Sequence, residues 1–302
     1  MNAIEIRNLR KNFGEKQALS GLNMTVPIGS IYGFIGENGS GKSTTEKIIC
    51  GLMHQTSGDI KLFDKDHNNE EIRSSIGVLI ESPGCYPNYS VWNNLMLQAA
   101  NLGIKNPEEE VRKILKVVRM EGAASNKYKN CSLGMKQRIG IAMALLGSPK
   151  LLVLDEPING LDADGMRIMR EVLLDVVKDG KCTVLVSSHI LGELEKIATH
   201  YGIVRSGKMI IEMTAEELDR NCPRFVALKT KDLSSTKKLL EKAYKRVTED
   251  TETGSIRVYD NVMPEDVVDY LYKNNIIATE IKTDKIGLEE YYINLMNKNG
   301  GK

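Results

Sequence analysis

The residues from Gly36 to Ser43 have the types and spacing that hold a phosphate chain. Their sequence, GENGSGKS, fits the pattern G-x-x-x-x-G-K-[ST]. Glycines there let the backbone curl so that successive N–H groups point at one anion, while Lys42 reaches the β- and γ-phosphates and the Ser43 hydroxyl ligates Mg²⁺. A helix that begins near Lys42 adds its positive end to the same anion. The motif predicts a site for a nucleoside triphosphate with magnesium.

A pair of carboxylates follows an apolar run later in the chain. Leu151 to Leu154 are four consecutive aliphatic residues, and Asp155 and Glu156 come directly after them. Such a run predicts a strand buried on both faces, whose carboxyl end is where parallel sheets bind ligands. Asp155 is placed to hold magnesium through water, and Glu156 to polarise an attacking water. The alternative is an acidic strand end that only meets solvent.

Strands and helices in a definite order must position these groups. Ser30 to Ile35 is expected to be the buried strand before the phosphate motif and Lys42 to Cys50 the helix after it, which favours a phosphate site over a ligand-free glycine turn. Residues from Val91 to about Leu146 have helical periodicity. From Leu151 onward strand and helix alternate, as in a parallel sheet with covering helices. The other expected strands are Ala3 to Leu9, Leu22 to Pro27, Gly58 to Phe63, Ile76 to Ile80, Leu151 to Asp155, Thr183 to Ser187 and the hairpin of Tyr201 to Val204 with Lys208 to Met213. The other expected helices are Ala163 to Lys178, Ile190 to Ala198 and Thr214 to Asn221.

The pattern changes near Cys222-Pro223, where we place a domain boundary. The remainder is expected to fold in the order β-α-β-β-α-β, which is the ferredoxin-like arrangement. The fold class predicted is therefore α/β, with a small α+β ferredoxin-like domain at the C-terminal end. The expected domains are residues 1–221, with a helical subdomain at about 88–147, and residues 222–302.

Composition excludes several classes of protein. The 302 residues are 41% hydrophobic and 27% charged with a net charge of +1, so the chain lacks the basic surplus of a nucleic-acid-binding protein. We expect no secretory leader and no membrane span, because no apolar run is long enough. Five cysteines without a C-x-x-C pair argue against a disulfide framework. A cytoplasmic protein, free or peripheral on a membrane, is expected.

A third motif, taken together with the first two, resembles a known protein family. Residues 131–138 read CSLGMKQR and precede an apolar helix, so that Ser132 is a natural N-cap and Gly134 leaves the helix start open to an anion. In this order and spacing, the three motifs resemble those of the ATP-binding subunits of ABC transporters over roughly Ala3 to Met213. The usual signature of that family is L-S-G-G-Q. Ser132 and Gly134 match it, whereas Cys131, Leu133 and Met135 do not.

The resemblance implies roles for three further positions. Phe13 stands where the family stacks an aromatic ring on adenine, although an isolated aromatic residue also fills cores. The segment Asn159 to Asp162 resembles the D-loop of the family. His189 resembles its switch histidine, which hydrogen-bonds the γ-phosphate and so senses its presence.

The loop after Ile80 indicates a branch of the family. ABC ATPases usually carry glutamine where this chain has Glu81, in the loop that touches magnesium and the membrane partner. Glutamate followed by the run Ser82 to Pro87 resembles the bacitracin-resistance and lantibiotic-immunity branch of peptide exporters. A carboxylate there adds negative charge beside magnesium, which tightens the metal and also repels phosphate.

These inferences together define the predicted site. The expected catalytic residues are Glu156, His189 and Lys42. The metal ligands are Ser43, Glu81 and Asp155. The residues expected to hold ATP are Phe13, Gly36, Glu37, Asn38, Gly39, Ser40, Gly41, Lys42, Ser43, Thr44, Ser132, Gly134 and Asp162.

The resemblance also implies partners. One chain carries one phosphate loop and one signature, and in this family the two motifs of a subunit bind different ATP molecules. A second ATPase subunit is therefore expected. The resemblance also implies a separate membrane permease and no nucleic-acid partner. Two alternatives stay open: a non-transport ABC ATPase of translation or chromosome maintenance, and a regulatory ATP-binding module. The chain has neither the second ATPase unit of the translation factors nor the long coiled-coil insertion of the chromosome proteins.

Overall fold

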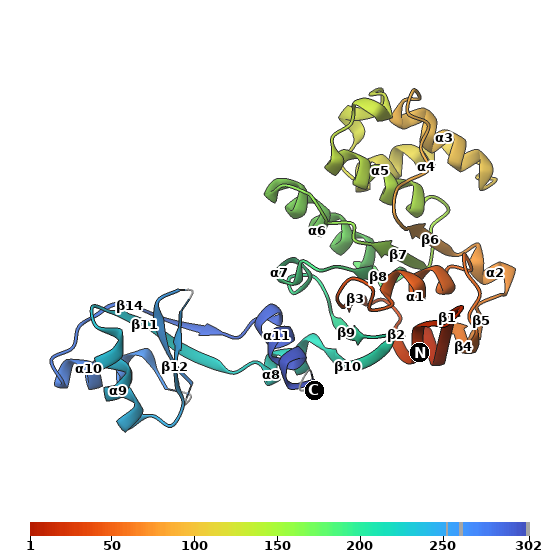
Figure 1. Cartoon of the computed structure of the whole chain (residues 1–302). Helices are drawn as coiled ribbons and strands as arrows, with labels where there is room; N and C mark the ends of the chain where they lie inside the picture. The colour runs from red at the N-terminus through yellow and green to blue at the C-terminus, as the bar shows by residue number, and fades with distance from the viewer. Residues whose placement is uncertain (252, 260–261, 300–302) are drawn as a thin grey trace. The chain divides into compact units, whose positions relative to one another are not determined.

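The computed structural model describes residues 1–251, 253–259 and 262–299 and divides the chain into two compact units. The first unit contains Met1–Ala215 and the second Glu216–Lys302, of which residues 300–302 lie outside the described part (Figure 1). This division falls before the predicted boundary at residues 221 and 222. The difference arises because Asp219 of helix α8 (Ala215–Asn221) forms an ion pair with Lys285 at 2.7 Å, which ties α8 to the second unit.

The first unit begins with an antiparallel sheet. Strands β1 (Asn2–Phe13) and β2 (Lys16–Pro27) form a hairpin, and β4 (Ser57–Leu62) and β5 (Lys65–Asp66) complete the order β2-β1-β4-β5. The first strand runs past its predicted end at Leu9 because its last residues pair with β2 up to the turn. Gly14 makes that turn at a φ of 58°, a left-handed conformation that favours glycine. As a result Phe13 and Lys16 lie opposite each other.

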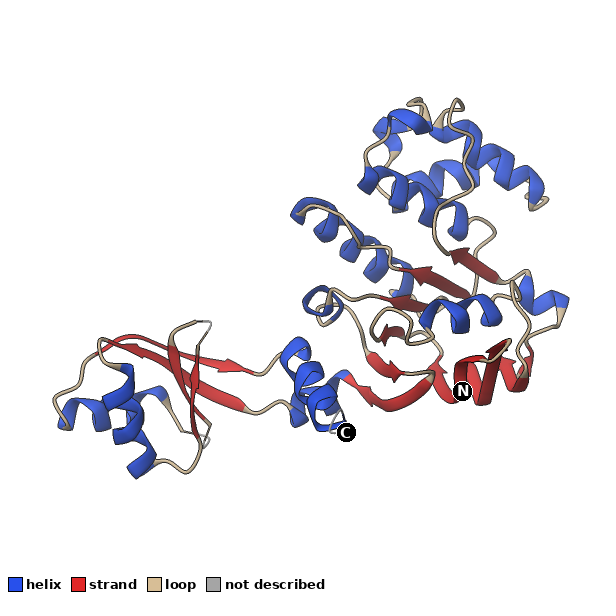
Figure 2. Ribbon diagram, in the orientation of Figure 1, coloured by secondary structure: helices blue, strands red, loops and turns tan. Residues whose placement is uncertain are grey.

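Six strands form the central sheet in the order β10-β9-β3-β8-β7-β6. The outer pair β10–β9 is antiparallel, and the pairs from β9 to β6 are parallel (Figure 2). Because parallel strands end at the same edge, the residues that follow β3, β7 and β8 come together there. The strands are β3 (Ile31–Ile35), β6 (Ile76–Leu79), β7 (Leu151–Asp155), β8 (Thr183–Ser187), β9 (His200–Arg205) and β10 (Lys208–Thr214).

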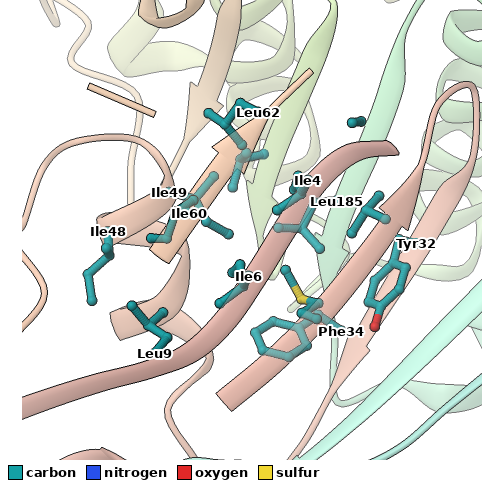
Figure 3. Close-up of a cluster of buried hydrophobic side chains, with 14 of the residues drawn as sticks. Ile4, Ile6, Leu9, Tyr32, Phe34, Ile48, Ile49, Ile60, Leu62 and Leu185 are labelled. Carbon is teal, nitrogen blue, oxygen red and sulfur yellow. The ribbon is translucent and has the colours of Figure 1, made fainter. Parts of the chain in front are cut away.

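A hydrophobic core joins the two sheets and helix α1 (Lys42–Ile49), as Figure 3 shows. Burying each of these aliphatic or aromatic side chains stabilises the fold by about 1.5–3 kcal/mol. The core therefore fixes α1, and with it the phosphate loop, against β7 and β8. Labelled in Figure 3 are Ile4, Ile6 and Leu9 of β1, Tyr32 and Phe34 of β3, Ile48 and Ile49 of α1, Ile60 and Leu62 of β4, and Leu185 of β8.

A helical subdomain lies at the β6 edge of the central sheet (Figures 1 and 2). It contains α3 (Val91–Asn101), α4 (Pro107–Val117) and α5 (Leu133–Leu145), with short 3₁₀ turns η1 (Glu121–Ala123) and η2 (Tyr128–Asn130) between α4 and α5. Helix α5 packs so closely on β6 that a Cβ at Gly77 would lie 2.1 Å from the carbonyl oxygen of Ala144. This contact fixes α5 against the sheet.

The remaining helices of the first unit are α2 (Glu70–Arg73), α6 (Ala163–Val177) and α7 (Leu191–Leu194). Helix α7 ends earlier than the predicted Ala198, because the N–H groups of Lys196 and Ile197 donate to carbonyl oxygens three residues back, which tightens the last turn. Within the described residues, no helix combines the length and the apolar character that crossing a membrane requires.

The second unit has the predicted β-α-β-β-α-β order. Its antiparallel sheet has the strand order β12-β13-β11-β14 and packs on a core that includes Val226, Leu240 and Leu271. This is the ferredoxin-like arrangement. The elements are β11 (Arg224–Thr230), α9 (Leu233–Ala243), β12 (Val247–Asp250), β13 (Ser255–Val258), α10 (Pro264–Lys273) and β14 (Ala278–Lys285), followed by α11 (Leu288–Asn299).

Candidate functional site

The loop from Gly36 to Ser43 joins β3 to α1 and has a buried lysine at its centre. The Lys42 residue is only 6% exposed, and its Nζ donates to the carbonyl oxygen of Gly36 at 2.6 Å. Glycine is required at Gly36, because a Cβ there would lie 2.5 Å from the carbonyl oxygen of Val204. Gly41, the N-cap of α1, has a φ of 111°. The loop can therefore curl around a ligand only with this glycine pattern.

A pocket of about 690 Å³ opens beside this loop, a size suited to a nucleotide. It brings together nine of the predicted site residues: Phe13, Asn38, Gly39, Gly41, Lys42, Ser43, Thr44, Asp155 and Glu156. The sequence analysis missed four more lining residues, Lys16, Gln17, Ala18 and Ser206. The signal that could have found three of these is the hairpin turn at Gly14, which carries β2 back beside Phe13.

Phe13 lies at the rim of this pocket. The residue is 47% exposed, so it does not fill the core, and the ammonium of Lys11 lies 5.0 Å from the centre of its ring. An exposed aromatic face next to a phosphate loop is available for stacking on a flat base.

The two carboxylates after the buried strand β7 are held by Ser187 at the end of β8. The Ser187 hydroxyl donates to Oδ1 of Asp155 at 2.9 Å and accepts the backbone N–H of Glu156 at 3.2 Å. Glu156 has a φ of 50°, a left-handed conformation that a side-chain-bearing residue adopts only where its surroundings impose it. The strained turn places the Glu156 side chain in the lining of the pocket next to Asp155.

His189 lies beside Glu156. Its Nδ1 is 2.7 Å from Oε2 of Glu156, and its backbone N–H donates to the same oxygen at 3.3 Å. The imidazole is 53% exposed, which leaves its other nitrogen accessible. The pair can bind a polar group that enters the pocket from solvent.

Glu81 is outside the lining of the pocket and pairs with a lysine of α1. Its Oε1 accepts from Nζ of Lys47 at 2.8 Å, and the carboxylate is 72% exposed. This hydrogen bond lowers the pKa of Glu81 and raises that of Lys47. The backbone at Glu81 is also left-handed, with a φ of 66°.

The signature residues and Asp162 cap two helices away from the pocket lining. Ser132 Oγ accepts from the N–H of Met135 at 3.3 Å at the start of α5, and Asp162 Oδ1 accepts from the N–H of Gly165 at 2.8 Å at the start of α6. A Cβ on Gly134 would meet only Leu161, at 3.6 Å. The first turn of α5 is therefore next to the Asn159 to Asp162 segment and open around Gly134.

The donor set fits a magnesium-bound phosphate chain. The buried Lys42 ammonium donates to the backbone carbonyl oxygens of Gly36 and Glu37, which carry no charge. The buried Ser40 hydroxyl has no hydrogen-bond partner. Ser43 and Asp155 supply oxygen ligands at the same pocket, and magnesium keeps several waters when it binds to one or two carboxylates and substrate phosphates. Across the described ranges, no three His, Cys, Asp or Glu side chains converge as a protein-only metal cage.

Comparison with known proteins decides the family. A family model described as ABC transporter matches residues 19–159. The bacitracin transport ATP-binding protein BcrA of Bacillus licheniformis is 35% identical over 297 residues, which cover 97% of each chain. This chain belongs to the ATP-binding proteins of ABC transporters. The lantibiotic transport ATP-binding protein SrtF of Streptococcus pyogenes is 41% identical to this ABC ATPase subunit over 209 residues, covering 69% of the subunit and 90% of SrtF.

Solved structures confirm the fold class of the ABC ATPase subunit. The cbiO1 protein of Clostridium perfringens, part of the cbiONQ ABC transporter complex, is 26% identical, with a TM-score of 0.66 over 72% of this chain and 91% of its own. An ATP-binding cassette in its ADP conformation is 27% identical, with a TM-score of 0.66 over 73% and 94%. The family resemblance inferred from the motifs is confirmed, and the subunit is an ATPase that binds adenine nucleotide.

Proposed function

We propose that this ABC ATPase subunit holds ATP in the pocket beside the phosphate loop and hydrolyses it there. Lys42 exchanges the Gly36 carbonyl for the phosphate oxygens, and Phe13 stacks on the adenine at the rim. Ser43 and Asp155 are the residues that would hold Mg²⁺, which when bound neutralises charge on the phosphates. Glu156 accepts the proton of the attacking water, and His189 hydrogen-bonds the γ-phosphate.

One observation supports a second copy. Ser132 and Gly134 stand at an open helix start, yet they are outside the lining of the pocket that contains Lys42 and Asp155. A helix N-terminus of this kind suits an anion that another chain presents. We propose that the signature of one subunit closes over the ATP held by the other. ATP that binds only the closed pair stabilises it by about 2.7 kcal/mol at a hundredfold excess over its dissociation constant.

A groove on the first unit supports a membrane partner. It has a volume of about 310 Å³ and lies between β6 and α5, with Leu52, Leu79, Pro83, Leu102 and Met143 in its lining. A groove with several apolar side chains, next to the loop that begins at Glu81, suits a short amphipathic helix of a permease. We propose that the subunit is peripheral on the cytoplasmic face of the membrane and transmits closure to a separate permease through this groove.

The relatives support an assignment of cargo class. BcrA is a bacitracin transport protein and SrtF a lantibiotic transport protein by their names, and both are at least 35% identical to this subunit. Because the cargo binds the permease, the residues of this chain do not contact it. We propose that the subunit powers export of an antimicrobial peptide or drug.

Co-purification from the membrane, followed by activity and resistance measurements, tests the whole proposal. The subunit is expressed with an affinity tag in its own cell, the membrane fraction is solubilised in mild detergent, and co-purifying proteins are identified. We expect an apolar permease, ATPase activity that rises with it, and peptide resistance that Lys42→Ala abolishes. Recovery of ribosomes or of chromosomal DNA without a permease would favour a non-transport ABC ATPase, and a soluble partner would favour a regulatory module.

A further inference from the structure

Strand β14 leaves one edge of the sheet in the second unit open. Across the residues that the structure describes, β14 pairs with β11 alone and ends the strand order β12-β13-β11-β14 (Figure 1). Most of its eight residues have exposed side chains, and none is a proline. Such an edge presents a row of backbone N–H and C=O groups that can pair with a further strand.

Helix α10 covers the β14 side of this sheet. It packs on β14, whereas α9 packs on β11, β12 and β13. The two helices meet through Tyr270 of α10, whose hydroxyl donates to the carbonyl oxygen of Leu239 of α9 at 3.3 Å. Val267 and Leu271 of α10 are buried in the core. The side of α10 that lies opposite Tyr270 is therefore the side next to the open edge of β14.

That side of α10 carries exposed apolar residues. At about 100° per residue from Val267, the side chains of Val268 and Tyr272 project on the side opposite Tyr270. Val268 is 40% exposed and Tyr272 is 77% exposed. Ile277, which comes between α10 and β14, is 78% exposed. Apolar side chains beside an open strand edge suit contact with another protein, and tyrosine is enriched in such interfaces.

The side chains of β14 are complementary to a second copy of the same strand. Ile281 packs on the core under the helices, whereas Glu280, Lys282 and Asp284 line a hollow on the opposite face of the sheet. An antiparallel pair with its two-fold axis at Ile281 places this residue opposite its own copy. Glu280 is then opposite Lys282 of the partner subunit, and this favourable pair occurs twice. An axis at Lys282 would instead place like charges opposite each other.

The charges on this edge are free to form such pairs. Within the chain, Glu280 forms an ion pair with Lys229 at 2.9 Å, and Lys282 forms one with Asp284 at 3.0 Å. All four side chains are about half exposed, and exposed ion pairs contribute little to stability. Exchanging these contacts for pairs between two chains therefore has a low cost.

We propose that β14 and α10 form an interface between two copies of this chain, in which the β14 edges pair antiparallel across Ile281. Val268 and Tyr272 then pack against the partner on the side of the sheet that the helices cover. The interface needs no nucleotide, so the inference goes beyond the proposed function and does not depend on it. Two subunits joined in this way would stay together after ATP is hydrolysed, which raises the effective concentration of each for the other.

The test measures pairing of the full chain without nucleotide or Mg²⁺. Sedimentation velocity over a concentration series gives the dimer dissociation constant. Glu280→Lys and Lys282→Glu each place like charges opposite each other across the axis, and Tyr272→Ser removes an apolar contact. Glu241→Lys, an exposed change on α9, is the matched control.

We expect a dimer of the wild type, and each of the three interface variants should raise the dissociation constant by at least about fivefold. An equimolar mixture of Glu280→Lys and Lys282→Glu should pair about as tightly as the wild type, because each reversed charge then faces an opposite charge in the other chain. The control should stay within about twofold of the wild type. Unfolding temperatures of all variants should match that of the wild type, because the changed positions are exposed.

Three results would overturn the interface. They are a wild type that stays monomeric over the whole series, a Tyr272→Ser variant that pairs as tightly as the wild type, and a mixture that pairs no better than its two components. A monomeric wild type whose co-purifying permease is lost in Tyr272→Ser would assign this side of the second unit to the permease. ATP-driven pairing of Glu156→Gln is measured separately, in the Lys282→Glu background, and its failure there would count against the proposed function alone.

Discussion

Nδ1 of His189 lies 2.7 Å from Oε2 of Glu156, and the backbone N–H of His189 donates to the same carboxylate oxygen. The two residues follow neighbouring parallel strands, β8 and β7, which end at one edge of the central sheet. Because His189 engages only Oε2 of Glu156, the other carboxylate oxygen can accept a proton from water. In the proposed function, this contact couples the residue that would sense the γ-phosphate to the residue that would activate water.

Glu156→Gln should slow ATP hydrolysis by about a hundredfold or more, because the amide cannot act as a general base. Because glutamine has nearly the same shape as glutamate, the affinity for nucleotide should persist, and ATP that is not hydrolysed should trap a dimer. Steady-state phosphate release and size-exclusion chromatography with Mg²⁺ and ATP measure both effects. Glu109→Gln, an exposed change on α4, is the control. Wild-type turnover in Glu156→Gln would refute the assignment.

His189→Ala should reduce hydrolysis less than the loss of Glu156 does. A hydrogen bond to a charged group is worth about 1.5–3 kcal/mol, which corresponds to about tenfold to 150-fold in rate. The affinity for ADP, which lacks the γ-phosphate, should not change. Single-turnover kinetics with ATP measure the loss of hydrolysis rate, and equilibrium binding measures the affinity for ADP. The exposed His54, changed to alanine, should leave both quantities as they are.

Gly134→Asp should abolish dimer formation on ATP without disturbing the subunit. A Cβ at this position meets nothing closer than Leu161 at 3.6 Å, and an acidic residue in the first turn of a helix is favourable. The carboxylate would instead repel the γ-phosphate of the facing subunit. Sedimentation of the Glu156→Gln, Gly134→Asp double variant with ATP tests this expectation.

The open position Gly122 provides the control for that experiment, since a Cβ there meets no atom within 4 Å. Gly122→Asp adds the same charge at a distance from the signature and should leave dimer formation intact. A dimer that persists in Gly134→Asp would show that the signature does not face phosphate.

Lys47→Ala should free the Glu81 carboxylate to reach magnesium. In the structure the two side chains form an ion pair at 2.8 Å. Exposed pairs of this kind contribute about 0.2–1 kcal/mol, so the half-saturating Mg²⁺ concentration should fall by no more than about fivefold. Adding Glu81→Gln should cancel the gain. The control is Lys113→Ala, an exposed change on α4. If Lys47→Ala shows the same Mg²⁺ dependence as this control, Glu81 is not part of the metal site.

Asp250 should make the second unit sensitive to acid. Hydrogen bonds from Thr253 and then from Arg257 lower the pKa of Asp250 to about 2. A carboxyl whose pKa is lower in the folded state than in the unfolded state stabilises the folded state at pH values above its unfolded pKa, which is about 4. That contribution is lost as the pH falls through the folded value.

The variant Asp250→Asn removes this contribution at every pH. At neutral pH we expect faster amide hydrogen exchange in β13, by an amount that corresponds to about 1–3 kcal/mol. The difference from wild type should shrink as the pH falls from about 4 to 2. Asp266→Asn, exposed on α10, is the control. A difference that does not depend on pH would contradict the assignment of the lowered pKa to Asp250.

The sequence by itself predicted the chemistry of the phosphate loop and the succession of strands and helices along the chain. Gly36 to Ser43 and the run Leu151 to Glu156 are local patterns, because one turn and one buried strand suffice to define them. The parallel sheet follows from strand and helix alternation, and it brings the ends of β3, β7 and β8 together. The family resemblance and the ferredoxin-like second unit were predictable for the same reason.

Only the tertiary structure decided which distant side chains meet. Lys16 and Ser206 line the pocket because two hairpins turn beside it, and Glu81 contacts Lys47 instead of the pocket. The sequence places Glu46 on a helix as an ordinary polar residue, yet the packing of α1 against the core buries it completely. Short motifs encode local backbone geometry, whereas burial and pairing depend on segments that are far apart in the sequence.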